Sequence, residues 1–348
     1  MMDIDGAYGE GGGQLLRTAV ALAAITGNPV HLRNIRARRR NPGLAAQHLT
    51  AVRAVAELCG AEVEGLALHS SELVLRPGPL RGGDYHWDVG TAGSITLVLQ
   101  AALPVALRCT ERMRLHITGG TDVRAAPPLD YFRHVFLPLL ARMGTQVELR
   151  VLRRGYYPRG GGAVEVDVWP CPALRPLQLD SCGALRALIG HAHVANLPAH
   201  IVERMGAAAA QGLAGIPLQM DAKILGHNEA IGTGGALVLV AHMAHTMLAA
   251  GVTAERGVPA EQLGAQAAEA LRTTLSSGAT LDVHAADQLL IYMALAHGVS
   301  RYKVQKLSSH ARTTLWLLEQ FLPLQVRIEA AGALTVVEVQ PEHRGRTA

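Results

Sequence analysis

Apolar residues recur three or four positions apart in three separate stretches of the chain, residues 11–66, 90–151 and 284–330. This spacing is typical of helices that bury one face. One such stripe consists of Leu49, Val52, Ala56 and Cys59. Each stretch has the same order: a helix opened by glycine or small polar residues, a short strand, a second helix and another strand. A glycine or proline follows each second helix, as is typical of helix ends. The pattern predicts three similar βαβα units around a shared core.

Two further features complete the predicted architecture. The hairpin signal "YYPRGGGAVEVDV" (156–168) supplies extra strands, so each unit is expected to be of βαβαββ type. The stretch between the second and third units departs from this order, with a strand-like "ALVLVAHMA" and a helix that has Pro259 at its first position and a Ser-Ser-Gly exit. We predict an α/β (α+β) fold. Residues 1–180 plus 277–340 would form a large repeat domain, and residues 181–276 a small inserted α/β domain.

The repeated order also predicts where the helices begin. The first helices are expected to start near Glu10–Gln14, Gly90–Ser94 and His284–Gln288. The second helices are expected to start near Pro42, Pro127 and His310. Helix N-termini present free N–H groups and a partial positive charge, so several of them converging would form an anion site.

Composition narrows the class of protein. Of 348 residues, 49% are hydrophobic, 17% are charged and only 4% are aromatic, which argues against a surface that binds single strands mainly by base stacking. The four cysteines form no CxxC pair and indicate thiols of a reducing compartment. The acidic, glycine-rich N-terminus is unlike a signal peptide, and the apolar runs are too short for a membrane span. We therefore expect a cytoplasmic protein with no membrane partner.

Basic residues are concentrated in one segment, although the net charge is only +4. The string "RNIRARRRNPG" places five arginines within eight positions: Arg33, Arg36, Arg38, Arg39 and Arg40. A guanidinium fork matches two phosphate oxygens, so this segment suits a phosphate-bearing ligand. An exposed basic turn without a ligand is the alternative.

The string "GEGGGQ" (9–14) resembles a loop that cradles phosphate, because glycines let the backbone approach a ligand closely. It matches neither of the common phosphate-loop motifs, and a flexible turn before a helix is the alternative. Glu10 is the unusual member of the string. A carboxylate beside phosphates is expected where a divalent cation lies between them, since Mg²⁺ is often held by one or two carboxylates plus phosphate oxygens.

Two other strings carry candidate binding residues. In "GGTDVRAAPPLDYF" (119–132), the paired prolines and Tyr131 would form one wall of a flat pocket for a base, or would simply start a helix. In "HAADQLL" (284–290), Asp287 and Gln288 fall in the first turn of a helix. The macrodipole favours an acid there without any ligand. The functional alternative is that Asp287 orients an imidazole or binds a ligand.

His310 opens the helix in "LSSHARTTLWLLEQF" (307–321), with Ser308 or Ser309 expected as its cap. The positive end of a helix disfavours imidazolium and lowers the pKa of a histidine placed there. A neutral imidazole is the nucleophilic form and could attack phosphorus. Since the chain has 16 histidines, an ordinary structural role is the alternative.

Together these strings closely resemble the RNA 3′-terminal phosphate cyclase family. The resemblance runs in order from residue 5 to about 323, and is poor over about 180–276 except around "VANLPAHIVER". The matching segments are "DGAYGEGGGQLLRTA", "IRARRRNPGLAAQHLTAV", "RGGDYHWDVGTAGSITLVLQ", "GGTDVRAAPPLDYF", "RGYYPRGGG", "ADQLLIYMALA" and "SSHARTTLWLLEQFLP". The resemblance implies a large domain of repeated α/β units, similar in outline to enolpyruvyl transferases, with a small inserted α/β domain.

The resemblance also implies an activity. Members of the family use ATP to convert an RNA 3′-phosphate end to a 2′,3′-cyclic phosphate. By this likeness His310 would attack the α-phosphorus of ATP, and the AMP would then pass to the RNA 3′-phosphate. The 2′-OH would finally close the ring and release AMP. ATP, Mg²⁺ or Mn²⁺ and an RNA with a 3′-phosphate end are therefore the expected cofactors and partner, and a homodimer is one expected assembly.

Site residues follow from the resemblance position by position. His310 and Asp287 would be catalytic, and Glu10 would bind the metal. The nucleotide pocket would consist of Gln100, Pro127, Tyr131, His284, Ala285, Ala286, Asp287 and Gln288. Phosphates of ATP or of the RNA end would bind Arg17, Arg36, Arg39 and Gln47. His284 departs from the family's usual tyrosine, which would reduce the stacking area on adenine. Tyr131 stands where phenylalanine can occur.

Two other functions remain as alternatives. A non-catalytic relative that binds RNA in ribosome assembly is disfavoured by His310, because that branch lacks the nucleophile. An enolpyruvyl transferase would rest on shared architecture alone.

Overall fold

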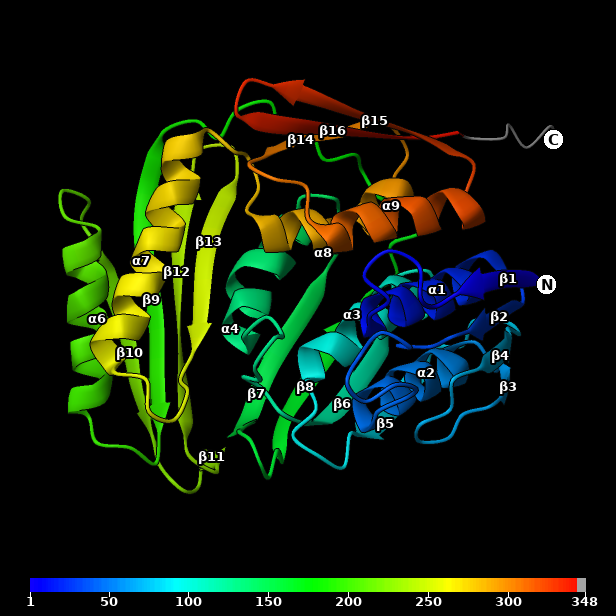
Figure 1. The fold of residues 1–348 in the computed structure, drawn as a ribbon, viewed down its shortest axis with the longest axis horizontal. Helices are drawn as coiled ribbons and strands as arrows, with labels where there is room; N and C mark the ends of the chain where they lie inside the picture. Colours follow the sequence, from blue (N-terminus) through cyan, green and yellow to red (C-terminus); the bar gives the residue numbers. More distant parts are fainter. Residues whose placement is uncertain (343–348) are drawn as a thin grey trace.

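The computed structural model describes residues 1–342 and shows a mixed α/β fold with helices packed on several mixed sheets. Parallel and antiparallel pairs occur together in most of these sheets. Figure 1 shows a sheet at one side of the molecule and the remaining layers packed against one of its faces.

The N-terminal part forms the first layer. Its sheet has the order β1-β2-β4-β3, in which β1 and β2 are parallel and the other neighbours antiparallel. The elements are β1 (Met2–Asp5), α1 (Gly13–Thr26), β2 (Val30–Arg33), α2 (Ala46–Leu58), β3 (Glu62–Glu64) and β4 (Leu73–Arg76).

The next part builds four strands of a five-stranded sheet of order β11-β7-β8-β6-β5, whose edge strand β11 (Ala230–Ile231) comes from later in the chain. The predicted hairpin is confirmed, because β7 and β8 pair antiparallel on either side of the turn. The elements are β5 (Gly83–Asp88), α3 (Ile95–Ala106), β6 (Met113–Gly119), α4 (Leu129–Tyr131), the π-helical segment η1 (Phe132–Phe136), α5 (Leu137–Ala141), β7 (Val147–Gly155) and β8 (Gly162–Val168).

The C-terminal part adds a three-stranded antiparallel sheet of order β14-β16-β15. Its elements are α8 (Val283–Ala294), β14 (Ser300–Val304), α9 (Ser309–Phe321), β15 (Leu324–Ala331) and β16 (Leu334–Pro341). The order helix, strand, helix, strand, strand thus occurs in all three parts. That they are repeats of one unit, similar to enolpyruvyl transferases, stays a prediction.

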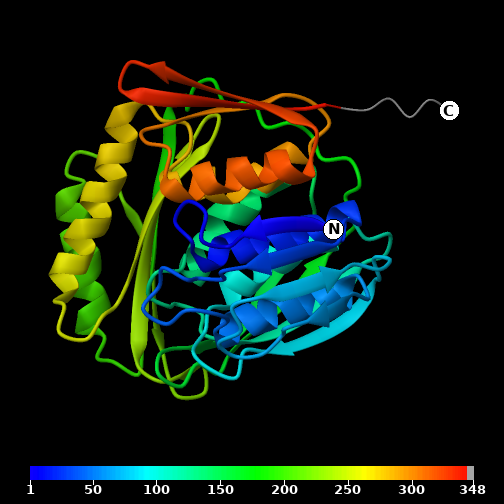
Figure 2. The same cartoon turned by 45° about the vertical axis from the view of Figure 1, so that its right-hand side comes forward.

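The remaining sheet, here called the lateral sheet, has the order β10-β9-β12-β13. Helices α6 and α7 cover its outer face, and the rest of the protein lies against the other face (Figure 2). The helices and the sheet enclose a second apolar cluster that includes Val202, Leu239 and Leu271. The elements are β9 (Leu185–Ala195), α6 (His200–Gly212), β10 (Gln219–Leu225), β11 (Ala230–Ile231), β12 (Gly234–Met243), β13 (Met247–Thr253) and α7 (Ala260–Ser277). The predicted domain boundaries themselves stay a prediction.

The main core lies between the layers. Helices α1, α3 and α8 are apolar on nearly every face, which is expected of helices surrounded by protein. Helix α3 packs against both of the others, and the second helices α2 and α9 cover this group. This arrangement brings together the N-termini of helices that are far apart in the sequence.

Several local predictions are confirmed. Helix α9 begins at Ser309 with Ser308 as its cap, and α3 is capped by Ser94. Helix α7 ends at Ser277, and its C-terminal capping residue, Gly278, has a φ of +76° that suits a residue without a Cβ. Pro259, predicted as the first residue of this helix, is instead its capping residue, so α7 begins one position later than predicted.

Three further local predictions are wrong. Helix α2 begins at Ala46 and not near Pro42, because Gly43 and Leu44 donate backbone hydrogen bonds to distant residues and are held in a loop. The helix predicted after Pro127 is interrupted by η1. Pro138 has no N–H and its ring clashes with the carbonyl one turn earlier, which accounts for the wider turn.

The third correction concerns the buried face of α2. Two members of the predicted stripe, Val52 and Cys59, are fully buried, but Leu49 and Ala56 are only half-buried. Outside the stripe, Ala51, Val55 and Leu58 are fully buried as well. Because α2 contacts α1, α3 and β5, its apolar stripe is broader than the one read from the spacing. Among residues 1–342, no helix is long and apolar enough to cross a membrane.

Candidate active site

The largest of the described cavities has a volume of about 860 Å³ and lies between the main core and the lateral sheet. The first turns of α1, α2, α8 and α9, the start of α3 and the loop before α4 all contribute residues to its wall. The predicted helix starts therefore meet around one cavity. Their free N–H groups and macrodipoles favour an anionic ligand there.

His310 lies on this wall in the first turn of α9. Its Nε2 is 2.9 Å from Oε2 of Glu10, which follows β1 at the other end of the chain. Partial burial lowers the pKa of His310, and the Glu10 carboxylate opposes this effect. The positive charges of Arg17 and Arg39 lower that pKa further. A neutral imidazole is therefore the main form at neutral pH, as the sequence predicted.

Glu10 is held by three partners. Its Oε1 pairs with the Arg39 guanidinium, and its Oε2 accepts a hydrogen bond of 3.2 Å from Ser309 Oγ in addition to the His310 contact. The glycines of "GEGGGQ" make room for these groups. A Cβ at Gly12 would lie 2.7 Å from the Arg39 guanidinium, and a Cβ at Gly13 would lie 2.0 Å from His48 Nε2. Here the glycines let side chains approach the backbone.

Arg17 is the most buried of the cavity's arginines, with 7% of its surface exposed. Burial lowers its pKa to about 10, so the guanidinium is still charged at neutral pH. Its Nη2 donates a hydrogen bond of 3.5 Å to Gln100 Oε1, and its buried Nε has no hydrogen-bond partner. A buried cation is costly unless it is paired. Phosphate oxygens are chemically suitable partners for this guanidinium.

Asp287 is the fifth residue of α8 and therefore lies in its second turn, not in the first turn as predicted, because the helix already begins at Val283. Its Oδ1 accepts a hydrogen bond of 2.7 Å from Ser308 Oγ, the cap of α9. This bond links the two helix starts, so Asp287 positions the turn that carries His310. Burial raises the pKa of Asp287 to about 7, although the Ser308 bond acts in the opposite direction. The Asp282 and Glu10 carboxylates add to the rise. Asp287 is therefore partly protonated at neutral pH.

The raised pKa of Asp287 predicts a pH-dependent stability. A carboxyl whose pKa is higher in the folded state stabilises that state at low pH, and the contribution is lost as the pH rises toward 7. The variant Asp287→Asn keeps the acceptor for Ser308 but cannot titrate. Between pH 5 and 8, we expect its melting temperature to fall by less than that of the wild type. Thermal unfolding at constant ionic strength measures this difference.

Asp84→Asn is the matched control for that experiment, because Asp84 is exposed. The Asp84→Asn profile is expected to follow the wild type. Parallel profiles for Asp287→Asn and the wild type would contradict the prediction.

The cavity wall also carries the rings of Tyr131 and His284. Tyr131 is almost fully buried, and its hydroxyl donates a hydrogen bond of 2.6 Å to Oδ1 of Asp282, which caps α8. Only part of the Tyr131 ring reaches the cavity wall. It meets His284 edge to face, with 6.0 Å between ring centroids. The exposed His284 imidazole is therefore the larger flat surface offered to a ligand.

The remaining predicted residues mostly lie on the same wall. The buried Oε1 of Gln288 has no hydrogen-bond partner, and Oε1 of Gln47 accepts a hydrogen bond from the backbone N–H of Ser94. The cavity brings together Glu10, Arg17, Arg36, Arg39, Gln47, Gln100, Pro127, Tyr131, His284, Asp287, Gln288 and His310.

Two predicted residues do not lie on the cavity wall. Ala285 and Ala286 belong to the main core, with 0% and 1% of their surfaces exposed. Their backbone N–H groups bond to Asp282. This placement follows from the helical period, because the residues between His284 and Asp287 turn toward the core. Any role for them is limited to shaping the turn.

Sequence reasoning missed part of the wall. His48 lines the cavity beside Gln47. Burial, together with the positive charges of Arg17 and Arg36, lowers the pKa of His48 to about 3. The lateral sheet, α7 and the connection between them add Gly251, Val252, Thr253, Glu255, Val258, Gln262, Leu263 and Gln266. No motif marks these residues, and the spacing of Gln262 and Gln266 on one face of α7 is the only local signal.

A divalent cation is a chemically reasonable ligand at Glu10. Within residues 1–342, no group of three or more histidine, cysteine or carboxylate side chains is arranged to hold a metal ion. A single carboxylate beside a site for phosphates is, however, a common arrangement for Mg²⁺. Glu10 fits that role, since it lines the same cavity as the buried guanidinium of Arg17.

Comparison with known proteins identifies the class of protein. Residues 8–328 match the family model described as RNA 3′-terminal phosphate cyclase. A Nitrosospira multiformis protein named RNA 3′-terminal phosphate cyclase is 58% identical over 99% of this chain and 98% of its own length. Proteins of the same name are 44% identical in Pyrobaculum neutrophilum, over 97% of both chains, and in Methanopyrus kandleri, over 98% and 99%. The chain belongs to the RNA 3′-terminal phosphate cyclase family.

Proposed function

We propose that this protein converts an RNA 3′-terminal phosphate to a 2′,3′-cyclic phosphate with ATP, through a covalent histidine–AMP intermediate. The observation that carries the proposal is a half-buried His310, in the first turn of α9, on the wall of a cavity that also contains the buried, carboxylate-free Arg17. A nucleophile and an anion site in one cavity are what nucleotidyl transfer requires. Family membership supports the same reaction.

Three displacements at phosphorus make up the proposed reaction. In the first, a nitrogen lone pair of His310 attacks the α-phosphorus of ATP, and pyrophosphate leaves with the electrons of the broken P–O bond. In the second, an oxygen of the RNA 3′-phosphate attacks the same phosphorus, the P–N bond breaks, and an RNA-adenylate end forms. In the third, the 2′-OH attacks the terminal RNA phosphorus, losing its proton to solvent or a base, and AMP leaves.

The residues of the chain account for much of this chemistry. The Glu10 carboxylate, beside Nε2, stabilises the positive charge that develops on the imidazole during attack. Arg17 and Arg39 are placed to neutralise phosphate charge. The Asp287–Ser308 bond fixes the start of α9 and hence the position of His310. A cation held by Glu10 would supply further charge neutralisation on the phosphates.

The alternative is a non-catalytic protein that binds RNA in ribosome assembly. His310 and its contact with Glu10 disfavour it, because binding alone requires neither. We also propose that the protein works in the cytoplasm and recognises mainly the RNA end.

An RNA oligonucleotide with a 3′-phosphate tests the proposal. With ATP and Mg²⁺ or Mn²⁺, we expect the end to become resistant to alkaline phosphatase, with one AMP released per cyclised end. The matched control has a 2′-deoxy terminal nucleotide, which lacks the nucleophile of the third displacement and should accumulate as the adenylate. An end that stays sensitive to phosphatase under these conditions would favour the binding-protein alternative.

A further inference from the structure

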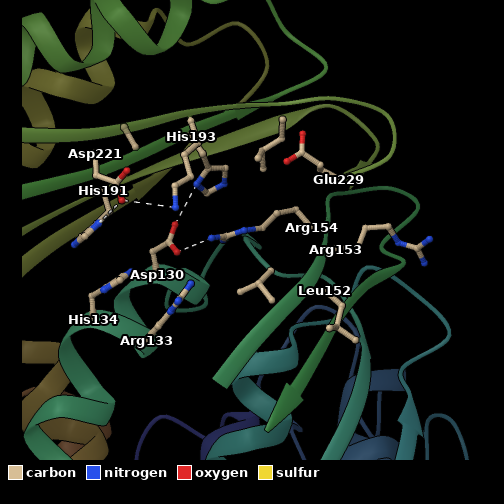
Figure 3. A pocket seen from close by; sticks show the side chains of 14 residues that line it. Asp130, Arg133, His134, Leu152, Arg153, Arg154, His191, His193, Asp221 and Glu229 are labelled. Atoms are coloured by element: carbon tan, nitrogen blue, oxygen red, sulfur yellow. Dashed lines mark hydrogen bonds and ion pairs between the residues drawn. The ribbon is translucent and has the colours of Figure 1, made fainter. Parts of the chain in front are cut away.

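A buried charged cluster lies between the lateral sheet and the wall of the main cavity. His193, on β9, is 3.1 Å from Asp130 through Nδ1 and 3.5 Å from Asp122 through Nε2. Arg154, on β7, donates to both carboxylates. Figure 3 shows the side chains of His193, Asp130 and Arg154 pointing toward one another across the gap between the two sheets. These four residues are here called the charged cluster.

The charged cluster is balanced only when His193 is protonated. Each of its four residues has less than 10% of its surface exposed, so water does little to screen the charges. Two carboxylates then face one guanidinium and one imidazolium. If His193 is neutral, one negative charge is left without a counter-charge in a buried site, which is costly.

The two carboxylates of the cluster stand at the ends of a segment that shapes the main cavity. Asp122 follows β6, and its Oδ1 accepts a hydrogen bond of 3.3 Å from the N–H of Leu129, the first residue of α4. Between them, residues 124–128 line the main cavity. Ala125 has a φ of +60°, an unfavourable conformation for a residue with a Cβ, so the surrounding contacts must hold it.

We propose that His193 is a positioning residue for the main cavity: by pairing with Asp122 and Asp130, it fixes the 122–130 segment that forms one wall. The inference rests on the proposed function only in taking that cavity as the nucleotide site. Neither His193 nor Arg154 lines the main cavity, so both act through the segment. The lateral sheet thereby controls the shape of a site whose nucleophile lies on α9.

This role depends on pH. The groups that face His193 are Asp122 from the β6–α4 connection, Asp130 from α4, Arg154 from β7 and, at 6.2 Å between ring centroids, Tyr156. Beside it on β10 is Lys223, its partner in strand register. Burial alone would lower the pKa of His193, but the two aspartates raise it above the ordinary value. The imidazolium therefore stabilises the folded segment below about pH 6.5, and this contribution is lost as the pH rises through the raised pKa.

Steady-state kinetics test the proposal with His193→Gln, which removes the charge and keeps a polar side chain. At pH 6 we expect the KM for ATP to rise about tenfold with kcat little changed, since coupling through a segment is typically worth 0.5–2 kcal/mol, roughly 2- to 30-fold. The ratio of the variant's KM to that of the wild type should fall toward 1 as the pH is raised to 9. Groups that titrate in both proteins, such as Asp287, cancel in this ratio.

His191→Gln is the matched control. His191 is two residues away from His193 on the same strand, and both residues line a separate small pocket of about 210 Å³. The ring of His191, however, stacks on His134, and its Nδ1 contacts Asp221. Its KM for ATP should equal that of the wild type at every pH. A His193→Gln ratio that is near 1 at pH 6, or that stays constant with pH, overturns the proposal.

A second measurement needs neither a nucleotide nor a stable variant. In the wild type without ligand, the hydrogen-exchange protection of the Leu129 N–H should fall about tenfold between pH 6 and 9, after correction for the intrinsic exchange rates. Protection in β6 and β8 should not change. Constant protection at Leu129 overturns the inference. If protection falls but no ATP is used, the proposed function fails while the role of His193 in holding the segment is upheld.

Discussion

Replacing His310 with alanine is expected to abolish the covalent protein–AMP adduct and to lower the rate of cyclisation by more than about 1,000-fold. In the proposed reaction, this imidazole forms the only covalent bond between protein and nucleotide. Without it, an oxygen of water or of the RNA end would have to attack ATP directly. The loss should be in kcat, because Arg17 and Arg39 remain to bind phosphates. The adduct is measured with α-labelled ATP, as label that stays with the denatured protein and is released by acid.

His227→Ala is the matched control, because His227 is exposed in the turn between β10 and β11 and does not line the main cavity. This variant should form as much adduct as the wild type. Equal melting temperatures of the three proteins would exclude unfolding as the cause of the loss. An acid-labile adduct that survives in His310→Ala would rule out His310 as the nucleophile and with it the proposed mechanism.

Replacing Arg17 with methionine is expected to weaken triphosphate binding about 10- to 100-fold, since hydrogen bonds to charged groups contribute about 1.5–3 kcal/mol. The same change should raise the melting temperature by about 1–3 °C. The guanidinium is buried without a carboxylate partner, and an apolar side chain of similar length removes that desolvation cost. Calorimetry with a non-hydrolysable ATP analogue measures the affinity, and thermal unfolding without ligand measures the stability.

Arg40→Met removes a guanidinium that does not line the cavity, and it serves as the control. Its affinity for the analogue should match that of the wild type. Arg17→Met is thus expected to weaken triphosphate binding and to raise the melting temperature, and these opposite effects distinguish an anion site from a structural role. A variant that is less stable and binds the analogue normally would show that Arg17 has a structural role and is not part of the anion site.

The site could be predicted in part because its signals are local. The Ser308 cap of α9 is set by residues within four positions of it. Asp287, expected in the first turn of α8, lies in the second turn because the helix begins earlier, at Val283. The family resemblance then supplied roles for Glu10 and His310, which no local pattern relates. Their contact at 2.9 Å became visible only in the structure, since 300 residues separate them.

Other parts of the site had no local signal. Gln262 and Gln266 read as ordinary polar positions of an amphipathic helix, and their place on the cavity wall depends on how α7 packs against the lateral sheet. Arg17 reads as one polar residue in an apolar helix. Its burial without a carboxylate depends on the side chains that α3 and α9 place around it.

The sequence by itself determined the order of the helices and strands, the positions of most helix starts and the chemistry available at them. These properties depend on apolar spacing, capping residues and glycine or proline, which act over a few residues. Only the tertiary structure decided which helix starts meet, which charges lose water and how His193 joins Asp122 and Asp130. Those outcomes depend on contacts between distant segments, and burial then changes the pKa values and the cost of leaving a charge unpaired.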